Sequence, residues 1–259
     1  SRMGLMTGRI QNRYGMRMLI NDSLDPAVGY HHLPVGEPTL ARILRDVGYR
    51  TVHIGKWHMS FPHRPGEPGM SDYGFDHHLL MSGAANYFGG TWTRDGVRIT
   101  TEGRWSAEVY VDEAIRFIEA DPNRPFFINL WSFCPHQEIM CSPEHAAQYA
   151  DRSKNEQTYY GAVTQMDEQY GRLLRYLDER GLADRTIVIF SSDNGPEPPV
   201  HPWSGLARGS TGGLRGGKHS LYDGGIREPG IVRWPGVTRP GTVSAEICWT
   251  PDVLATLAE

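Results

Sequence analysis

Three stretches of the chain repeat apolar residues at the spacing of one helix face. Residues 40–47 follow the i, i+3, i+4, i+7 pattern, and Gly48 stands where such a helix would end. The same pattern recurs over residues 107–118, with Ser106 as the expected N-cap, and over residues 163–177, which mark one face of a long helix that closes at Gly181. The sequence therefore predicts three amphipathic helices at these positions.

Short apolar runs lie between these helices, at residues 51–54, 126–131 and 186–190. Runs without polar alternation are typical of strands that are buried on both faces of a parallel sheet. Because strands and helices alternate, we predict an α/β fold with a mostly parallel central sheet flanked by helices on both faces. Residues 61–103, rich in Gly, Pro and aromatic residues, are interpreted as an irregular excursion that shapes a substrate pocket.

Each predicted strand is followed by side chains that carry charge, transfer protons or ligate metals. Lys56 and His58 follow the first strand, His136 follows the second, and Asp193 and Asn194 follow the third. In open α/β sheets, ligands bind beyond the carboxyl ends of the strands. We therefore expect these side chains to meet at one edge of the sheet and to form a site.

Further groups extend the chemistry of this edge. Residues 196–225 form a loop rich in Gly and Pro that carries Lys218, and Arg2 adds a planar cation near the start of the chain. Asp193 and Asn194 supply the oxygen ligands that Ca²⁺ or Mg²⁺ prefers, although two ligands do not complete a metal site. A divalent cation among Lys, Arg and His side chains suits a multiply charged oxyanion. Attack on a sulfuryl or phosphoryl centre is the chemistry that this combination indicates.

Each motif by itself has an ordinary structural explanation. Asp-Asn-Gly after a strand is more often a turn than a metal site, and Pro135-His136 alone is a loop histidine. The Gly-Gly-Lys segment does not satisfy the GxxxxGK[ST] pattern of a phosphate-binding loop. For a group of aromatic residues we favour plain packing in the core, and stacking on a sugar is the alternative. These residues are Tyr73, Phe75, Tyr87, Phe88, Trp92 and Trp105.

Composition excludes several classes of protein. The 259 residues include 26 Lys and Arg against 30 Asp and Glu, a net charge of −4 that argues against nucleic acid as a partner. We find no run of about 18 consecutive apolar residues, so no membrane span is predicted. The three cysteines form no CxxC pair, which argues against a disulfide framework and a cysteine zinc site.

The order of the motifs resembles that of the type I sulfatases, which belong to the alkaline-phosphatase superfamily. The resemblance covers nearly the whole chain, and Asp223 stands where the family usually has Glu. It implies the alkaline-phosphatase type of α/β fold and the hydrolysis of aryl or carbohydrate sulfate esters. The segments that match are residues 1–9, 55–58, 135–136, 192–195 and 216–229.

The resemblance also implies a catalytic role for each cation and histidine. Lys56 and Lys218 would bind sulfate oxygens, and His136, together with Lys218, would bind the ester and protonate the leaving alcohol. His58 would accept the proton whose removal releases sulfate. Arg2 would hold the oxygen of the nucleophile.

The family's cofactors are implied in the same way. Asp193 and Asn194 would bind Ca²⁺, with Mg²⁺ as the alternative. The nucleophile is a Cys or Ser oxidised to formylglycine, and it would lie upstream of Ser1, together with an Asp-Asp pair of metal ligands on the first strand.

Residues 1–259 would then be the central part of a sulfatase-like catalytic domain, an incomplete fold. Its N-terminal strand and its C-terminal subdomain would be absent, so the chain alone is expected to be inactive. Family members are commonly exported, to the periplasm or the outside of the cell, or lysosomal. The sequence does not indicate the oligomeric state.

Two other functions stay open at this point. Sulfate and phosphate monoesters are similar in shape, so the cations alone do not exclude a phosphoryl or phosphonate ester hydrolase. A non-catalytic homologue that binds an anion or a glycan is the second alternative.

Overall fold

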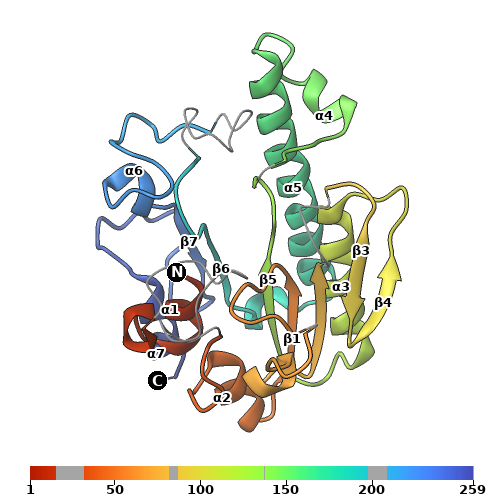
Figure 1. Ribbon diagram of the computed structural model, residues 1–259, viewed down its shortest axis with the longest axis vertical. Coiled ribbons are helices and arrows are strands. Elements are labelled where there is room, and N and C mark those ends of the chain that lie inside the picture. The colour runs from red at the N-terminus through yellow and green to blue at the C-terminus, as the bar shows by residue number, and fades with distance from the viewer. Residues whose placement is uncertain (16–31, 63, 82–86, 137, 198–208, 259) are drawn as a thin grey trace.

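The computed structural model describes residues 1–15, 32–62, 64–81, 87–136, 138–197 and 209–258 (Figure 1). Within these residues, a five-stranded sheet has the strand order β4-β3-β2-β1-β5. Strand β1 pairs in parallel with β2 and β5, whereas β3 pairs antiparallel with both β2 and β4. The strands are β1 (Arg50–Gly55), β2 (His77–Met81), β3 (Thr91–Arg94), β4 (Val97–Thr100) and β5 (Phe126–Trp131).

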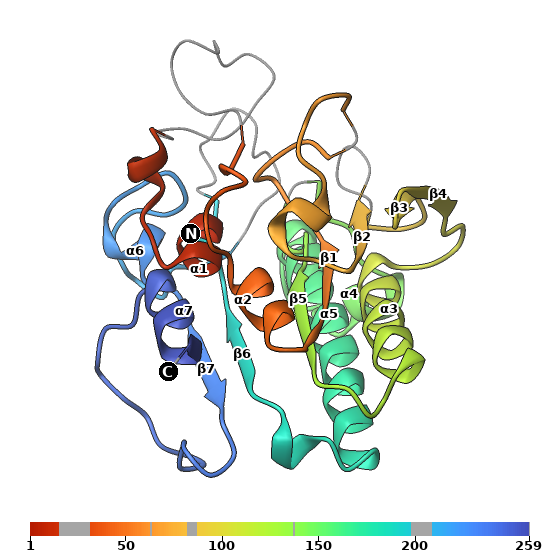
Figure 2. The same ribbon diagram turned by 90° about the horizontal axis from the view of Figure 1, so that it is seen from below.

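Helices cover both faces of this sheet, as Figure 2 shows. The first face carries α1 (Arg2–Thr7), α2 (Leu40–Asp46) and α7 (Thr250–Ala258), which share one apolar cluster with β5. The opposite face carries α3 (Ser106–Ala120) and α5 (Lys154–Glu179), and the short α4 (Pro143–Ala147) packs on α5. None of the helices in the described ranges combines the length and the apolar sequence that a membrane crossing requires.

Side chains of the central strands point alternately to the two faces of the sheet and so contribute to the apolar cluster on each face. Val52 and Ile54 of β1 pack against α3, together with Ile128 of the neighbouring β5. His53, between them, points to the opposite face and meets the ring of Trp131 at 5.3 Å. Successive residues of a strand face opposite sides, so a strand covered on both sides needs apolar or neutral residues throughout. The predicted α/β architecture, with helices on both faces, is confirmed.

The helix boundaries differ from those expected. The helix predicted over residues 107–118 begins at Ser106 itself, with Trp105 in the N-cap position and its N–H donating to Glu108 Oε2 at 3.2 Å. The long helix begins at Lys154, ahead of the apolar pattern that marks its face, and it ends at Glu179, close to the predicted stop at Gly181. Its N-cap is Ser153, whose Oγ accepts a hydrogen bond from the N–H of Glu156 at 3.4 Å.

The expectation of an irregular excursion over residues 61–103 is wrong. Its described part forms β2, β3 and β4 and a 3-10 turn at Met70–Tyr73, and these strands widen the central sheet. The strands are only four or five residues long, which leaves little periodicity to recognise. Of the aromatic residues there, Tyr73, Phe75, Tyr87 and Trp92 are buried, in agreement with packing, while Phe88 is exposed and contacts Trp105.

The third predicted strand does not join the main sheet within the described residues. Strand β6 (Val188–Ser191) pairs antiparallel with β7 (Gly230–Arg233) in a separate two-stranded sheet. Ile189 and Phe190 are exposed, so the prediction of a strand buried on both faces is wrong for β6. The ring of Phe190 lies 6.4 Å from that of Tyr170, which places β6 against α5.

Candidate functional site

The segment that follows β6 meets the first residues of the chain. Arg2 Nη2 donates a hydrogen bond to Asp193 Oδ2 at 2.5 Å, and Ser1 Oγ donates to the backbone carbonyl of Asp193 at 2.6 Å. The Arg2 side chain is 20% exposed, and its burial lowers the pKa of the guanidinium while Asp193 partly offsets the shift. Arginine keeps its charge nevertheless, so this edge holds a fixed cation beside a carboxylate.

Lys56 enters the same region from the end of β1. Gly55 has a φ of +105°, and a Cβ there would lie 2.1 Å from the carbonyl oxygen of Trp131, so only glycine fits. The N–H of Lys56 donates to that oxygen at 3.0 Å. Burial lowers the pKa of Lys56 to about 8, with further lowering by the charges of Arg2 and Lys218 and an opposing effect of Asp193. These charges interact, so the structure brings together the three cations and Asp193.

His136 follows β5 and is linked to Lys56 through an aromatic ring. The ring of Phe133 lies 5.1 Å from Lys56 Nζ, and the His136 ring lies 4.6 Å from the same Phe133 ring. The N–H of His136 donates to the carbonyl of Phe133 at 2.8 Å, and Tyr87 Oη donates to the carbonyl of His136 at 2.5 Å. These contacts hold the His136 backbone close to the end of β1.

Lys218 is held by the loop that follows the Asp-Asn-Gly turn. Its Nζ lies 2.7 Å from Glu197 Oε2, and its backbone N–H donates to the carbonyl of Pro196 at 2.9 Å. Gly195 has no room for a side chain, because a Cβ there would lie 1.9 Å from the carbonyl oxygen of Gly224. The two glycine-containing segments therefore lie directly against each other, and this packing sets the position of Lys218.

His58 and Asn194 lie close in sequence to Lys56 and Asp193. His58 lies two residues after Lys56, is half-buried, and has a backbone φ of +59°. Asn194 follows Asp193, and its amide nitrogen donates to the carbonyl of Gly195 at 2.9 Å. The contacts described above join Arg2 to Asp193 and link Lys56 to His136 through the ring of Phe133.

The oxygen donors fit a divalent cation in kind and fall short in number. Asp193 offers a carboxylate whose Oδ2 is already paired with Arg2, and Asn194 adds one amide oxygen. Among the described residues, no three His, Cys, Asp or Glu side chains are grouped so that they could hold a metal ion. Calcium takes about six to eight oxygen ligands, so these two residues would be only part of a metal site.

Sequence reasoning missed a buried histidine beneath this edge. His53 is fully buried, which lowers its pKa to about 3, and its Nδ1 accepts a hydrogen bond from Asn129 Nδ2 at 2.9 Å. Its ring packs edge-on against Trp57 and Trp131, and the guanidinium carbon of Arg2 lies 5.9 Å from the Trp131 ring. A neutral imidazole thus supports the aromatic layer under Arg2. A histidine between the apolar residues Val52 and Ile54 was the signal for it.

Two carboxylates near the site were also missed. Glu197 pairs with Lys218, and Glu228 has an Oε1 that is buried without a hydrogen-bond partner in the described structure. Burial raises the pKa of Glu228, and the negative charge of Asp193 raises it further. Pro196-Glu197 follows one recognised motif and Glu228 lies within another, but nothing in their spacing shows what they contact.

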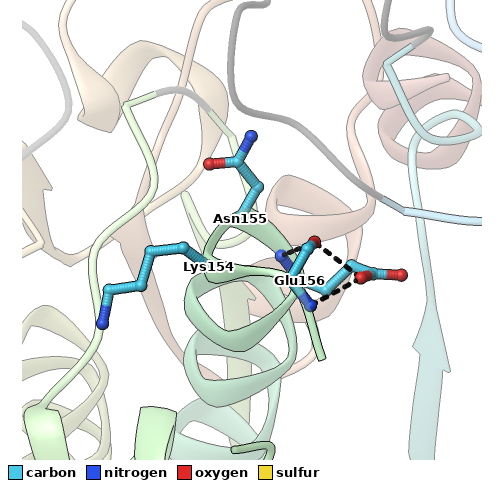
Figure 3. A pocket seen from close by; sticks show the side chains of 4 residues that line it. Lys154, Asn155 and Glu156 are labelled. Carbon is cyan, nitrogen blue, oxygen red and sulfur yellow. Dashed lines mark hydrogen bonds between the residues drawn. The ribbon is translucent and has the colours of Figure 1, made fainter. Parts of the chain in front are cut away.

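Figure 3 shows a pocket at the start of α5, whose lining includes none of the residues above. It is lined by Ser153, Lys154, Asn155 and Glu156. Glu156 Oε2 accepts hydrogen bonds from the N–H and the Oγ of Ser153, at 3.0 and 2.6 Å. This reciprocal arrangement caps the helix, so Ser153 and Glu156 are explained without a ligand.

Comparisons with known proteins show what the chain is similar to. The family model described as Sulfatase matches residues 1–259. Human arylsulfatase A is 32% identical, over 100% of this chain and 53% of that protein. Human N-acetylgalactosamine-6-sulfatase is 29% identical, over 99% of this chain and 51% of that protein. The chain thus spans about half the length of the curated relatives that it matches.

A solved structure shares the fold. The crystal structure of Ps i-CgsB in complex with k-i-k-neocarrahexaose matches with a TM-score of 0.84 at 24% identity. The match covers 99% of this chain and 60% of that one. At this level of identity, the likeness shows the fold alone.

Proposed function

The chain belongs to the sulfatase family, and on that premise we propose that it contributes the catalytic site of a sulfuric ester hydrolase. The observation that carries the proposal is the meeting of cations from separate segments. Arg2 pairs with Asp193 at 2.5 Å, and Arg2 and Lys218 both act on the charge of Lys56. Fixed cations of this kind offset the charge on the oxygens of a tetrahedral anion.

In this proposal, the side chains of the site bind the sulfate group and move protons. Lys56 and Lys218 bind sulfate oxygens, and His136 protonates the leaving alcohol together with Lys218. His58 accepts the proton whose removal lets sulfate leave. Arg2 orients the attacking oxygen. These roles rest on the family resemblance, and they are supported by the charges of Arg2 and Lys218 that act on Lys56 and by the contact of Lys56 and His136 with the same Phe133 ring.

The cofactors belong to the proposal as well. Asp193 and Asn194 would give oxygen ligands to Ca²⁺, or to Mg²⁺ as the alternative, with the remaining ligands supplied by groups outside the described residues. The cation would contribute positive charge beside the sulfate oxygens. A formylglycine upstream of Ser1 would supply the nucleophile. The 259-residue chain alone would then bind sulfate without turning an ester over.

We propose a small-molecule or glycan sulfate ester as the substrate. One relative is named for an aryl sulfate and the other for a sulfated sugar, and the Ps i-CgsB structure holds an oligosaccharide. An exported or lysosomal location is proposed on the basis of the family alone.

Sulfate release from an aryl sulfate by a longer protein that contains this chain tests the function. Lys218→Ala and His136→Ala are each expected to lower kcat by about 10²–10³, because each removes a group aimed at charge that develops in the transition state. Lys154→Ala, in the pocket at the start of α5, should leave the rate unchanged.

The outcomes separate the functions that the sequence left open. Variants that keep the wild-type rate would contradict the assigned roles. Faster hydrolysis of the matching phosphate ester would move the assignment to phosphoryl transfer. A wild-type protein that binds sulfate and hydrolyses neither ester would be a binding homologue.

A further inference from the structure

We propose that Glu197 is a positioning residue that orients Lys218 in the anion pocket, an inference that rests on the proposed function. Glu197 Oε2 lies 2.7 Å from Lys218 Nζ. The side chains are only 9% and 17% exposed, respectively. Solvent and salt screen such a pair less than they screen surface ion pairs, so the carboxylate holds the ammonium in a defined place.

The loop that carries Glu197 also holds the backbone of Lys218. The N–H of Lys218 donates to the carbonyl of Pro196 at 2.9 Å, directly beside Glu197. The second carboxylate oxygen of Glu197 lies 3.7 Å from His219 Nε2, and His219 has a φ of +71°. Residues 196–197 therefore fix both the start and the end of the Lys218 side chain.

Such anchoring matters because lysine is flexible and because its neighbours repel it. A lysine ammonium sits on a four-carbon stem with rotatable bonds and has three donors. The positive charges of Lys218 and Arg2 both act on Lys56. Glu197 accepts a hydrogen bond from one of the three donors of Lys218 and leaves two for substrate oxygens. In this proposal, it holds the ammonium in the anion pocket against the repulsion of the neighbouring cations.

A double-mutant cycle in the longer protein tests this role. Glu197→Ala is expected to lower kcat/KM for an aryl sulfate by about 10–100-fold, because small misplacements of a binding group are costly. Glu197→Gln keeps an oxygen acceptor and should lose only about 3–10-fold. Because Glu197 acts through Lys218, Glu197→Ala in a Lys218→Ala background should change kcat/KM by less than about twofold.

The same double-mutant cycle can be measured without turnover, as the affinity for inorganic sulfate determined by calorimetry. Sulfate affinity should fall in Glu197→Ala and should not fall further when Lys218 is already alanine. Should Glu197→Ala not fold, the cycle is run with Glu197→Gln. The control is Glu119→Gln, which removes a 2.7 Å ion pair with Arg180 away from the site and should change neither quantity.

Two results would overturn the proposal. One is an equal loss from Glu197→Ala with and without the Lys218 side chain, which would indicate a general structural effect. The other is unchanged sulfate affinity in Glu197→Ala with Lys218 intact. Absence of sulfate release by the wild type would refute the proposed function alone, because the sulfate-binding cycle still reports on Glu197.

Discussion

Lys56 shows how burial and nearby charge act on one side chain of the site. Its half-buried ammonium has lost part of its hydration, and this lowers its pKa to about 8. Arg2 and Lys218 add repulsion, and Asp193 opposes them. A lysine in this environment changes its charge in a pH range where a normal lysine stays protonated.

We predict that affinity for inorganic sulfate weakens as the pH rises through about 8. The protonated form of Lys56 attracts the anion, and the charge is lost above its pKa of about 8, so Kd increases on the alkaline side. Calorimetric titrations between about pH 7 and pH 10 measure this. In Lys56→Arg the guanidinium stays charged, so the decline should move to higher pH. A wild-type Kd that is constant over this range would contradict the prediction.

The positions of single site residues were predictable where a strand end marks them. Lys56 and Asp193 follow recognisable apolar runs, and the rule that ligands bind beyond strand ends is enough to suggest that they meet. Glu197 and His53 carry no such signal. The partner of Glu197 depends on how two loops pack. Whether His53 is a core residue or a site residue becomes clear only once its aromatic neighbours are known.

At the level of elements, the pairing of β1 with β5 sets the geometry of the site. The strands run parallel from Arg50 opposite Phe126 to Gly55 opposite Trp131. The close approach at Gly55 brings the exits of both strands together, so that Lys56 leaves one and residues 133–136 leave the other. A change at this glycine therefore affects the fold and the site at once.

We predict that Gly55→Ala lowers the free energy of unfolding by about 2–5 kcal/mol, from strain at positive φ and overlap with backbone. The added Cβ would lie 2.1 Å from the carbonyl oxygen of Trp131. Gly48→Ala is the matched control, because Gly48 also has a positive φ, +98°, and a Cβ added there would meet no atom within 4 Å.

The control should cost only about 1–2 kcal/mol, the strain alone. Denaturant unfolding of both variants measures the difference. Equal losses for the two would show that the contact at Gly55 is not the critical one.

Helix and strand positions were predictable from periodicity only where large apolar side chains repeat. Helix α5 extends to Lys154, ahead of the apolar pattern that marks its face, and its first turns include Gly161. A Cβ on Gly161 would lie 2.8 Å from Cys141 Sγ, so close packing there uses a residue without a side chain. Such a contact leaves no hydrophobic pattern in the sequence. The local signal for the start of this helix was the pair of capping residues Ser153 and Glu156.

Across the whole molecule, the site joins two sheets and a helix from distant parts of the chain. Arg2 of α1 and Asp193 after β6 are 191 residues apart in sequence, and the charges of both act on Lys56, which follows β1 of the main sheet. The β6–β7 sheet is exposed, with Ile231 at 61% and Val232 at 48%. The apolar run of β6 predicted a strand correctly, but an apolar run does not specify which strand is its neighbour.

The most direct test of the account is the position of inorganic sulfate in a crystal structure of the longer protein that contains this chain. The account predicts sulfate oxygens about 3 Å from both Lys56 Nζ and Lys218 Nζ, a hydrogen-bond distance, with His136 alongside. Sulfate bound only elsewhere, for example at the start of α5, would contradict it, since helix N-termini bind anions without any catalytic site.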